Sequence, residues 1–193
     1  LRDVRPRSKK GLGGFDVRRH EGGADLDRLG IGSVTVNIPL RFLRREAGPT
    51  TLRHEYAGET FHYDATAIRH LDRTLRFCCE RDVVVSAIIL VGVHRDAPLD
   101  VLTHPDCVEG ARYSMPNLTT AAGVRTYAAM LDFLAERYSR EDGEFGRIHH
   151  WIAHNEVDIG WVWTNVGERS LHGYMAPYHK SMRIIQAIVR QYD

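Results

Sequence analysis

Cysteine is scarce in this sequence, and its three cysteines form no recognisable framework. Cys78 and Cys79 are adjacent within a segment of helical periodicity and therefore point to different sides of it. His149, His150 and His154 lie close together, but their spacing matches no zinc motif. We therefore expect buried free thiols, no disulfide framework and no bound metal.

The sequence also lacks a long apolar run and an excess of charge of either sign. No stretch of about 18 apolar residues occurs, so we expect no segment that spans a membrane. Lys and Arg total 26 against 25 for Asp and Glu, a balance that gives no electrostatic reason to expect nucleic acid as a partner. With 43% hydrophobic and 26% charged residues, residues 1–193 suit one globular domain.

A phosphate-binding glycine loop is missing as well. The segment Gly11-Leu12-Gly13-Gly14 is rich in glycine but lacks the GxGxxG spacing with which dinucleotide-binding folds join their first strand to a helix. We therefore expect no nucleotide and no other cofactor.

What the sequence does contain is a repeated alternation of strand and helix signals. The predicted strands are residues 10–14, 34–40, 83–91 and 151–156. The predicted helices are residues 25–29, a segment capped by Asp64, a segment capped by Thr119 or Thr120, and a last helix opened by Ser170. Its expected inner face carries Leu171, Tyr174, Tyr178, Met182, Ile185 and Val189. A hairpin over residues 52–63, with its turn at Gly58, is predicted after the second strand.

This order of elements implies parallel strands joined by right-handed crossovers. An open doubly wound sheet and part of a barrel both fit it. The barrel is favoured because Asn37, His94 and the pair Asn155-Glu156 lie at or just past the C-terminal ends of predicted strands, where barrel enzymes keep their catalytic groups. We predict an α/β fold of the (β/α)8 TIM-barrel type, of which four βα units, half a barrel, are present.

The segment Trp151-Ile152-Ala153-His154-Asn155-Glu156-Val157 resembles the fourth-strand motif of the clan A glycoside hydrolases. Residues 34–40, 131–138 and 151–167 are similar to a bacterial branch of that superfamily. The resemblance implies a retaining (β/α)8 hydrolase of a β-linked poly- or oligosaccharide, with Glu156 as general acid/base and Asn155 orienting the sugar. It also implies an exported enzyme of polysaccharide degradation.

The chemistry explains why a carboxyl group belongs at this position. Retaining hydrolysis requires a proton for the departing oxygen and a second carboxylate about 5–5.5 Å away. Strand alternation predicts that His154 and Glu156 share a face with Ile152, and that Trp151 and Ala153 face the helices. In the alternative interpretation, Glu156 is an ordinary carboxylate in a loop.

Four more residues are candidates for substrate binding. Asn37 is expected to donate to a sugar, unless it only caps its strand, and His94 is expected to contact substrate. Trp161 and Trp163 are expected to form a stacking platform, because the C–H faces of pyranose rings favour aromatic surfaces. The alternative for one of the two tryptophans is core packing.

One feature departs from the family pattern. The resemblance implies a nucleophilic Glu on a seventh strand, whereas this sequence ends at Asp193 after the fourth helix. A complete barrel has about 250 residues. We expect a fragment of a longer enzyme. The alternatives are a half barrel completed by pairing with itself or another chain through its exposed edges, and a non-catalytic module that binds carbohydrate or a partner protein.

Overall fold

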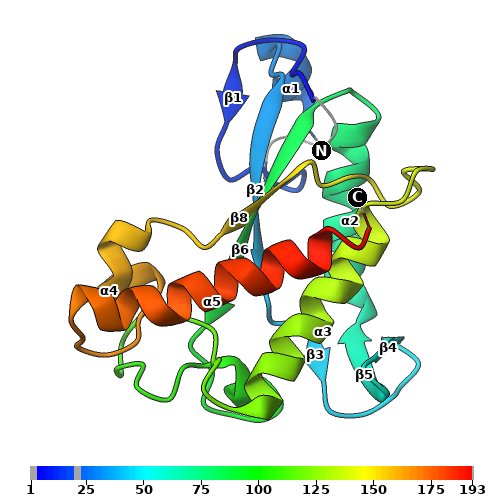
Figure 1. Ribbon diagram of the computed structural model, residues 1–193. Helices are drawn as coiled ribbons and strands as arrows, with labels where there is room; N and C mark the ends of the chain where they lie inside the picture. Colours follow the sequence, from blue (N-terminus) through cyan, green and yellow to red (C-terminus); the bar gives the residue numbers. More distant parts are fainter. Residues whose placement is uncertain (1–3, 20–22, 193) are drawn as a thin grey trace.

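A curled parallel sheet forms the centre of the computed structural model, which describes residues 4–19 and 23–192. Its strands are β1 (Gly11–Leu12), β2 (Ser33–Pro39), β6 (Val84–Gly92) and β8 (His150–Ala153). They pair in chain order, β1 with β2, β2 with β6 and β6 with β8, so the sheet is half of a barrel wall (Figure 1). A short strand, β7 (Tyr113–Ser114), runs antiparallel against the end of β6. The predicted α/β half barrel is therefore confirmed.

A helix follows each parallel strand. These helices are α1 (Ala24–Leu29), α2 (Ala65–Cys79), α3 (Ala121–Tyr138) and α5 (Leu171–Val189). Three short helical turns lie in the loops: η2 (Asp100–Leu102), η3 (Val157–Ile159) and α4 (Gly160–Trp163). Asp64, Thr120 and Ser170 cap α2, α3 and α5 by accepting backbone N–H groups, as predicted. Among the described helices, none is long and apolar enough to cross a membrane.

The hairpin predicted after the second strand is present and gains a third strand. The strands β3 (Leu43–Arg44), β4 (Thr51–Tyr56) and β5 (Glu59–Asp64) form a small antiparallel sheet at the lower end of the view in Figure 1. The turn between β4 and β5 places Ala57 and Gly58 at φ angles of 50° and 80°. Tyr63 of β5 is buried, with its ring centroid 4.7 Å from that of Phe133 in α3, which fixes the hairpin to the helical layer.

The two faces of the half barrel differ in what covers them. The face packed by the helices carries Val34, Val36 and Ile38 of β2 with Val85, Ala87, Ile89 and Val91 of β6, all in the hydrophobic core. The alternate residues lie on the opposite, concave face. There Asn37, Ile88 and Ile152 are neighbours in the strand register. Asn37 and Ile152 are exposed, so this face is open near its C-terminal end.

Two details of the prediction were wrong. The last helix does not bury Leu171 or Met182, whose side chains are 77% and 42% exposed, because α5 packs inward through Ser181, Ile185 and Ile188. The fourth strand was expected to reach Glu156 but ends at Ala153. By contrast, Trp151 and Ala153 pack against the core beneath the helices, as predicted.

Candidate functional site

His154 directly follows the last residue of β8, and its backbone adopts the left-handed conformation with φ 70°. Its Nδ1 lies 3.2 Å from the carbonyl oxygen of Ile89, which can only accept, so Nδ1 carries the proton. Nε2 therefore accepts from the Ser181 hydroxyl at 2.7 Å. Burial lowers the pKa of His154 to about 4. The prediction that His154 shares the face of Ile152 was wrong, because this turn sends the imidazole into the helical layer.

Asn155 and Glu156 follow this anchored residue directly. Glu156 is exposed and has a left-handed backbone, with φ 39° and ψ 57°. Its carbonyl accepts from Ile159 N–H at 2.9 Å, which holds the turn into η3. A groove of about 710 Å³ is lined by residues of β8, of the segment that follows it and of α5, among them Ile152, Glu156 and Met182. The carboxylate thus stands at the C-terminal end of the fourth parallel strand.

A second group of side chains gathers where β6 ends on the concave face. Tyr113 of β7 pairs directly with Gly92 of β6, and directly opposed residues of an antiparallel pair lie on the same face. The Trp163 ring stacks on Tyr113, with centroids 5.2 Å apart and planes 9° from parallel. The Arg112 guanidinium carbon lies 5.8 Å from the Tyr113 centroid and 5.4 Å from the Trp163 centroid.

His94 belongs to the same group. A Cβ on Gly92 would lie 2.7 Å from His94 Nε2, so the imidazole folds closely over the glycine. The backbone N–H of His94 donates to Thr103 Oγ1 at 2.8 Å, which fixes the main chain at this residue. Its Nε2 is buried and has no hydrogen-bond partner among the described residues. Burial, and then the nearby Arg41, lower the pKa of His94, so the ring is neutral at physiological pH.

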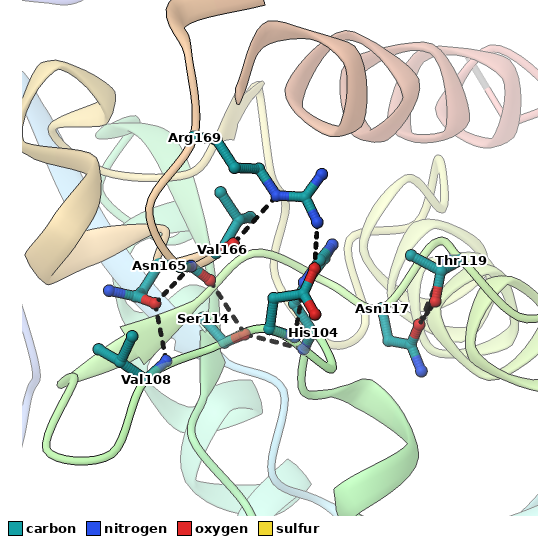
Figure 2. A network of polar contacts seen from close by, with 10 residues as sticks. His104, Val108, Ser114, Asn117, Thr119, Asn165, Val166 and Arg169 are labelled. Carbon is teal, nitrogen blue, oxygen red and sulfur yellow. Dashed lines mark hydrogen bonds and ion pairs between the residues drawn. The ribbon is translucent and has the colours of Figure 1, made fainter. Parts of the chain in front are cut away.

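A network of hydrogen bonds joins the loop after β6 to the loop after β8 (Figure 2). Asn165 Oδ1 accepts from Val108 N–H at 3.0 Å, and Asn165 Nδ2 donates to the Trp161 carbonyl at 3.0 Å. Ser114 Oγ accepts from His104 N–H at 2.9 Å. These bonds fix the segments that carry Arg112, Tyr113 and Trp163, so their geometry is set by the fold.

The structure brings together only part of the predicted site. Trp163 stacks on Tyr113 at the end of β6, where His94 also lies against Gly92, whereas Trp161 is 69% exposed on α4 and Asn155 is half-buried. Asn37 is among the residues that line a cavity of about 200 Å³, to which α2 also contributes, apart from the groove that contains Glu156.

Arg112 and Tyr113 were missed by sequence reasoning. They lie in a stretch for which no strand or helix was predicted, because a two-residue strand leaves no periodic signal. In the described part of the chain, no three His, Cys, Asp or Glu side chains are grouped so that they could hold a metal ion.

Comparison with known proteins identifies a family and gives no activity. No curated protein and no solved structure matches the chain. Residues 3–193 match the model of a family described as "Family of unknown function (DUF5722)". Since this match spans nearly the whole sequence, the chain belongs to the DUF5722 family.

Proposed function

We propose that this chain forms the acid/base half of a retaining glycoside hydrolase of the (β/α)8 type, with Glu156 as the general acid/base. The observation that carries the proposal is the exposed side chain of Glu156 in the loop just past the C-terminal end of the fourth strand of a half barrel whose strands pair in chain order. Catalytic groups of (β/α)8 enzymes lie in the loops at this end of the strands.

The chemistry assigned to Glu156 is proton transfer. Its carboxylic acid protonates the departing glycosidic oxygen, and the resulting carboxylate then takes a proton from the water that releases the sugar. The hydrogen bond between His154 and Ser181 holds the chain two residues before Glu156 and so anchors the loop that carries it. The resemblance places the nucleophilic Glu on a seventh strand. The described residues form four parallel strands, so the proposal requires that carboxylate to come from outside them.

Substrate binding is assigned to the concave face and its rim. His94 is half-buried and its Nε2 has no hydrogen-bond partner among the described residues, so it is assigned a hydrogen bond to a sugar hydroxyl, for which the ring turns Nε2 away from Gly92. Trp161 offers an exposed indole face for a pyranose ring. Asn37 and Asn155 are assigned hydrogen bonds to the sugar.

The test is hydrolysis of a panel of β-linked poly- and oligosaccharides by the full-length protein and by its Glu156→Gln variant. Loss of a general acid lowers the rate by about 10²–10⁴-fold. The loss should be smaller for aryl glycosides whose leaving group needs no proton, and added azide should restore turnover of these substrates. Asp158→Asn is the matched control, because Asp158 lines the same groove. Equal rates for the Glu156→Gln variant and the natural protein would exclude the assignment.

A non-catalytic assembly or carbohydrate-binding module is the second candidate. Within the described residues, β8 pairs only with β6, so its other edge has no strand partner. Ile152 and Met182 are exposed beside that edge at 36% and 42%. An open edge with apolar neighbours favours association with another strand. Saccharide binding, or self-association, with no hydrolysis of any substrate would favour this function over the enzyme.

A further inference from the structure

Arg112 is an exposed cation for which the described residues supply no anionic partner. Its guanidinium makes no ion pair and no hydrogen bond with them, and its contacts are with two aromatic rings. Neighbouring arginines differ from it. Arg169 is paired with Asp106, and Arg95 donates to the Cys107 carbonyl at 3.2 Å. Arg112 therefore keeps its five N–H donors available to a ligand.

The rings of Tyr113 and Trp163 hold this guanidinium in position. Tyr113 is bound through its backbone on two sides, because β7 pairs with β6 and the Tyr113 carbonyl accepts from Asn165 N–H at 3.2 Å. Trp163 is stacked on Tyr113, so both rings are fixed relative to the sheet. A cation held against such rings loses less conformational entropy when it binds a ligand.

The position of Arg112 connects it with the concave face. Tyr113 lies opposite Gly92, and the His94 imidazole lies over the same glycine. A sugar that contacts His94 is therefore bound at the same end of β6 as Tyr113, whose ring Arg112 contacts. A planar guanidinium matches carboxylate and sulfate oxygens with two parallel hydrogen bonds that the negative charge strengthens, whereas a neutral sugar offers no charge to pair with.

We infer that Arg112, Tyr113 and Trp163 form a subsite for the anionic group of an acidic sugar. The inference rests on the proposed function and narrows its substrate class to β-linked saccharides that carry a carboxylate or a sulfate. Arg112 acts in this subsite as a specificity-determining residue that pairs with the anion, and the two rings position it.

The experiment compares the binding of three oligosaccharides of equal length: one neutral, one containing uronic acid and one sulfated. Titration calorimetry is carried out on full-length protein carrying Glu156→Gln, so that the ligands are not consumed. The acidic ligands should bind about tenfold more tightly than the neutral one, and added salt should reduce this preference. Whichever acidic ligand binds more tightly identifies carboxylate or sulfate as the natural group.

Arg112→Gln should abolish the preference and leave the affinity for the neutral ligand unchanged. Arg112→Lys should keep part of the preference for acidic ligands, because the positive charge remains but the planar set of guanidinium N–H donors is lost. The control is Arg73→Gln, which removes an exposed charge from α2 and should change nothing.

Equal affinity for neutral and acidic ligands, a preference that survives Arg112→Gln, or no binding of any saccharide would overturn the subsite. Hydrolysis by the natural protein is measured separately. If the natural protein hydrolyses a neutral substrate but shows no preference for acidic ligands, the proposed subsite is excluded and the hydrolase assignment stands. If acidic ligands are preferred but no substrate is hydrolysed, the hydrolase assignment is excluded and the subsite stands.

Discussion

The hydroxyl of Ser181 on α5 donates at 2.7 Å to Nε2 of His154, the first residue after β8. The hydroxyls of Tyr127 and Ser181 are 2.9 Å apart, so α3 joins the same chain of hydrogen bonds. His154 Nδ1 extends this chain of hydrogen bonds to the carbonyl oxygen of Ile89 in β6. Two strands and two helices therefore meet at one buried point, one residue before the Asn155-Glu156 pair.

Replacing Ser181 by Ala should destabilise the protein. The change leaves His154 Nε2 and the Tyr127 hydroxyl buried without their partner, at a cost of about 1–3 kcal/mol. The control is Ser86→Ala, whose hydroxyl contacts the exposed His150 at 3.2 Å, and its cost should stay within about 0.5 kcal/mol. Urea denaturation of both variants measures the difference. Equal losses of unfolding free energy in the two variants would contradict a central role for the buried hydrogen bonds of Ser181.

Protein stability should fall as the pH drops from about 6.5 towards 4. Burial lowers the pKa of His154 to about 4, and burial lowers that of His149 to about 4 as well. In this pH range the unfolded state binds protons that the folded state does not, so the free energy of unfolding decreases with falling pH. For the fully buried His154 the loss approaches about 3 kcal/mol.

Unfolding measured at several pH values between 4 and 7.5 checks this expectation. His154→Asn should lower the stability at neutral pH and make the curve flatter, because one of the two groups is removed. A curve for the natural protein that is flat over this range would show that the histidines are not held neutral by the fold.

Periodicity was sufficient to predict the half barrel because its strands are buried by helices on one face. The run from Val84 to Gly92 is almost wholly apolar, as expected for a central strand. The N-caps Asp64 and Thr120 could be predicted because each stands directly before the helix that it caps. The left-handed turn at His154 could not be predicted. It depends on partners 27 and 65 residues away in the sequence, Ser181 and Ile89.

The aromatic group at the end of β6 escaped prediction for a related reason. Tyr113 and Trp163 are far apart in the sequence, and only the pairing of β7 with β6 brings them together. The inner face of α5 was predicted correctly at Ile185 and wrongly at Met182, because the residues of α5 that pack inward are Ser181, Ile185 and Ile188.

Gly92→Ala should test the position of His94. The new Cβ would lie 2.7 Å from His94 Nε2 and must push the imidazole away from the end of β6. If His94 binds the sugar, saccharide affinity should fall about tenfold, which equals about 1.4 kcal/mol of binding free energy. Calorimetric titration measures the affinity, and circular dichroism checks that the variant remains folded.

Gly48→Ala is the matched control, since a Cβ at Gly48 meets no atom within 4 Å. It should bind saccharide as the natural protein does. Unchanged affinity in the Gly92→Ala variant would exclude His94 from the binding site while leaving the assignment of Glu156 open to its own test.

The free edge of β8 should mediate any self-association of the chain. Ile152 is 36% exposed at this edge, and burying an isoleucine side chain contributes about 1.5–3 kcal/mol, so Ile152→Lys should weaken association about tenfold or more. Val108→Lys is the control, because Val108 is 46% exposed in a loop away from the edge. Sedimentation velocity over a range of concentrations measures the equilibrium. If Val108→Lys and Ile152→Lys weaken association equally, the contact does not use this edge, because only Ile152 lies on it.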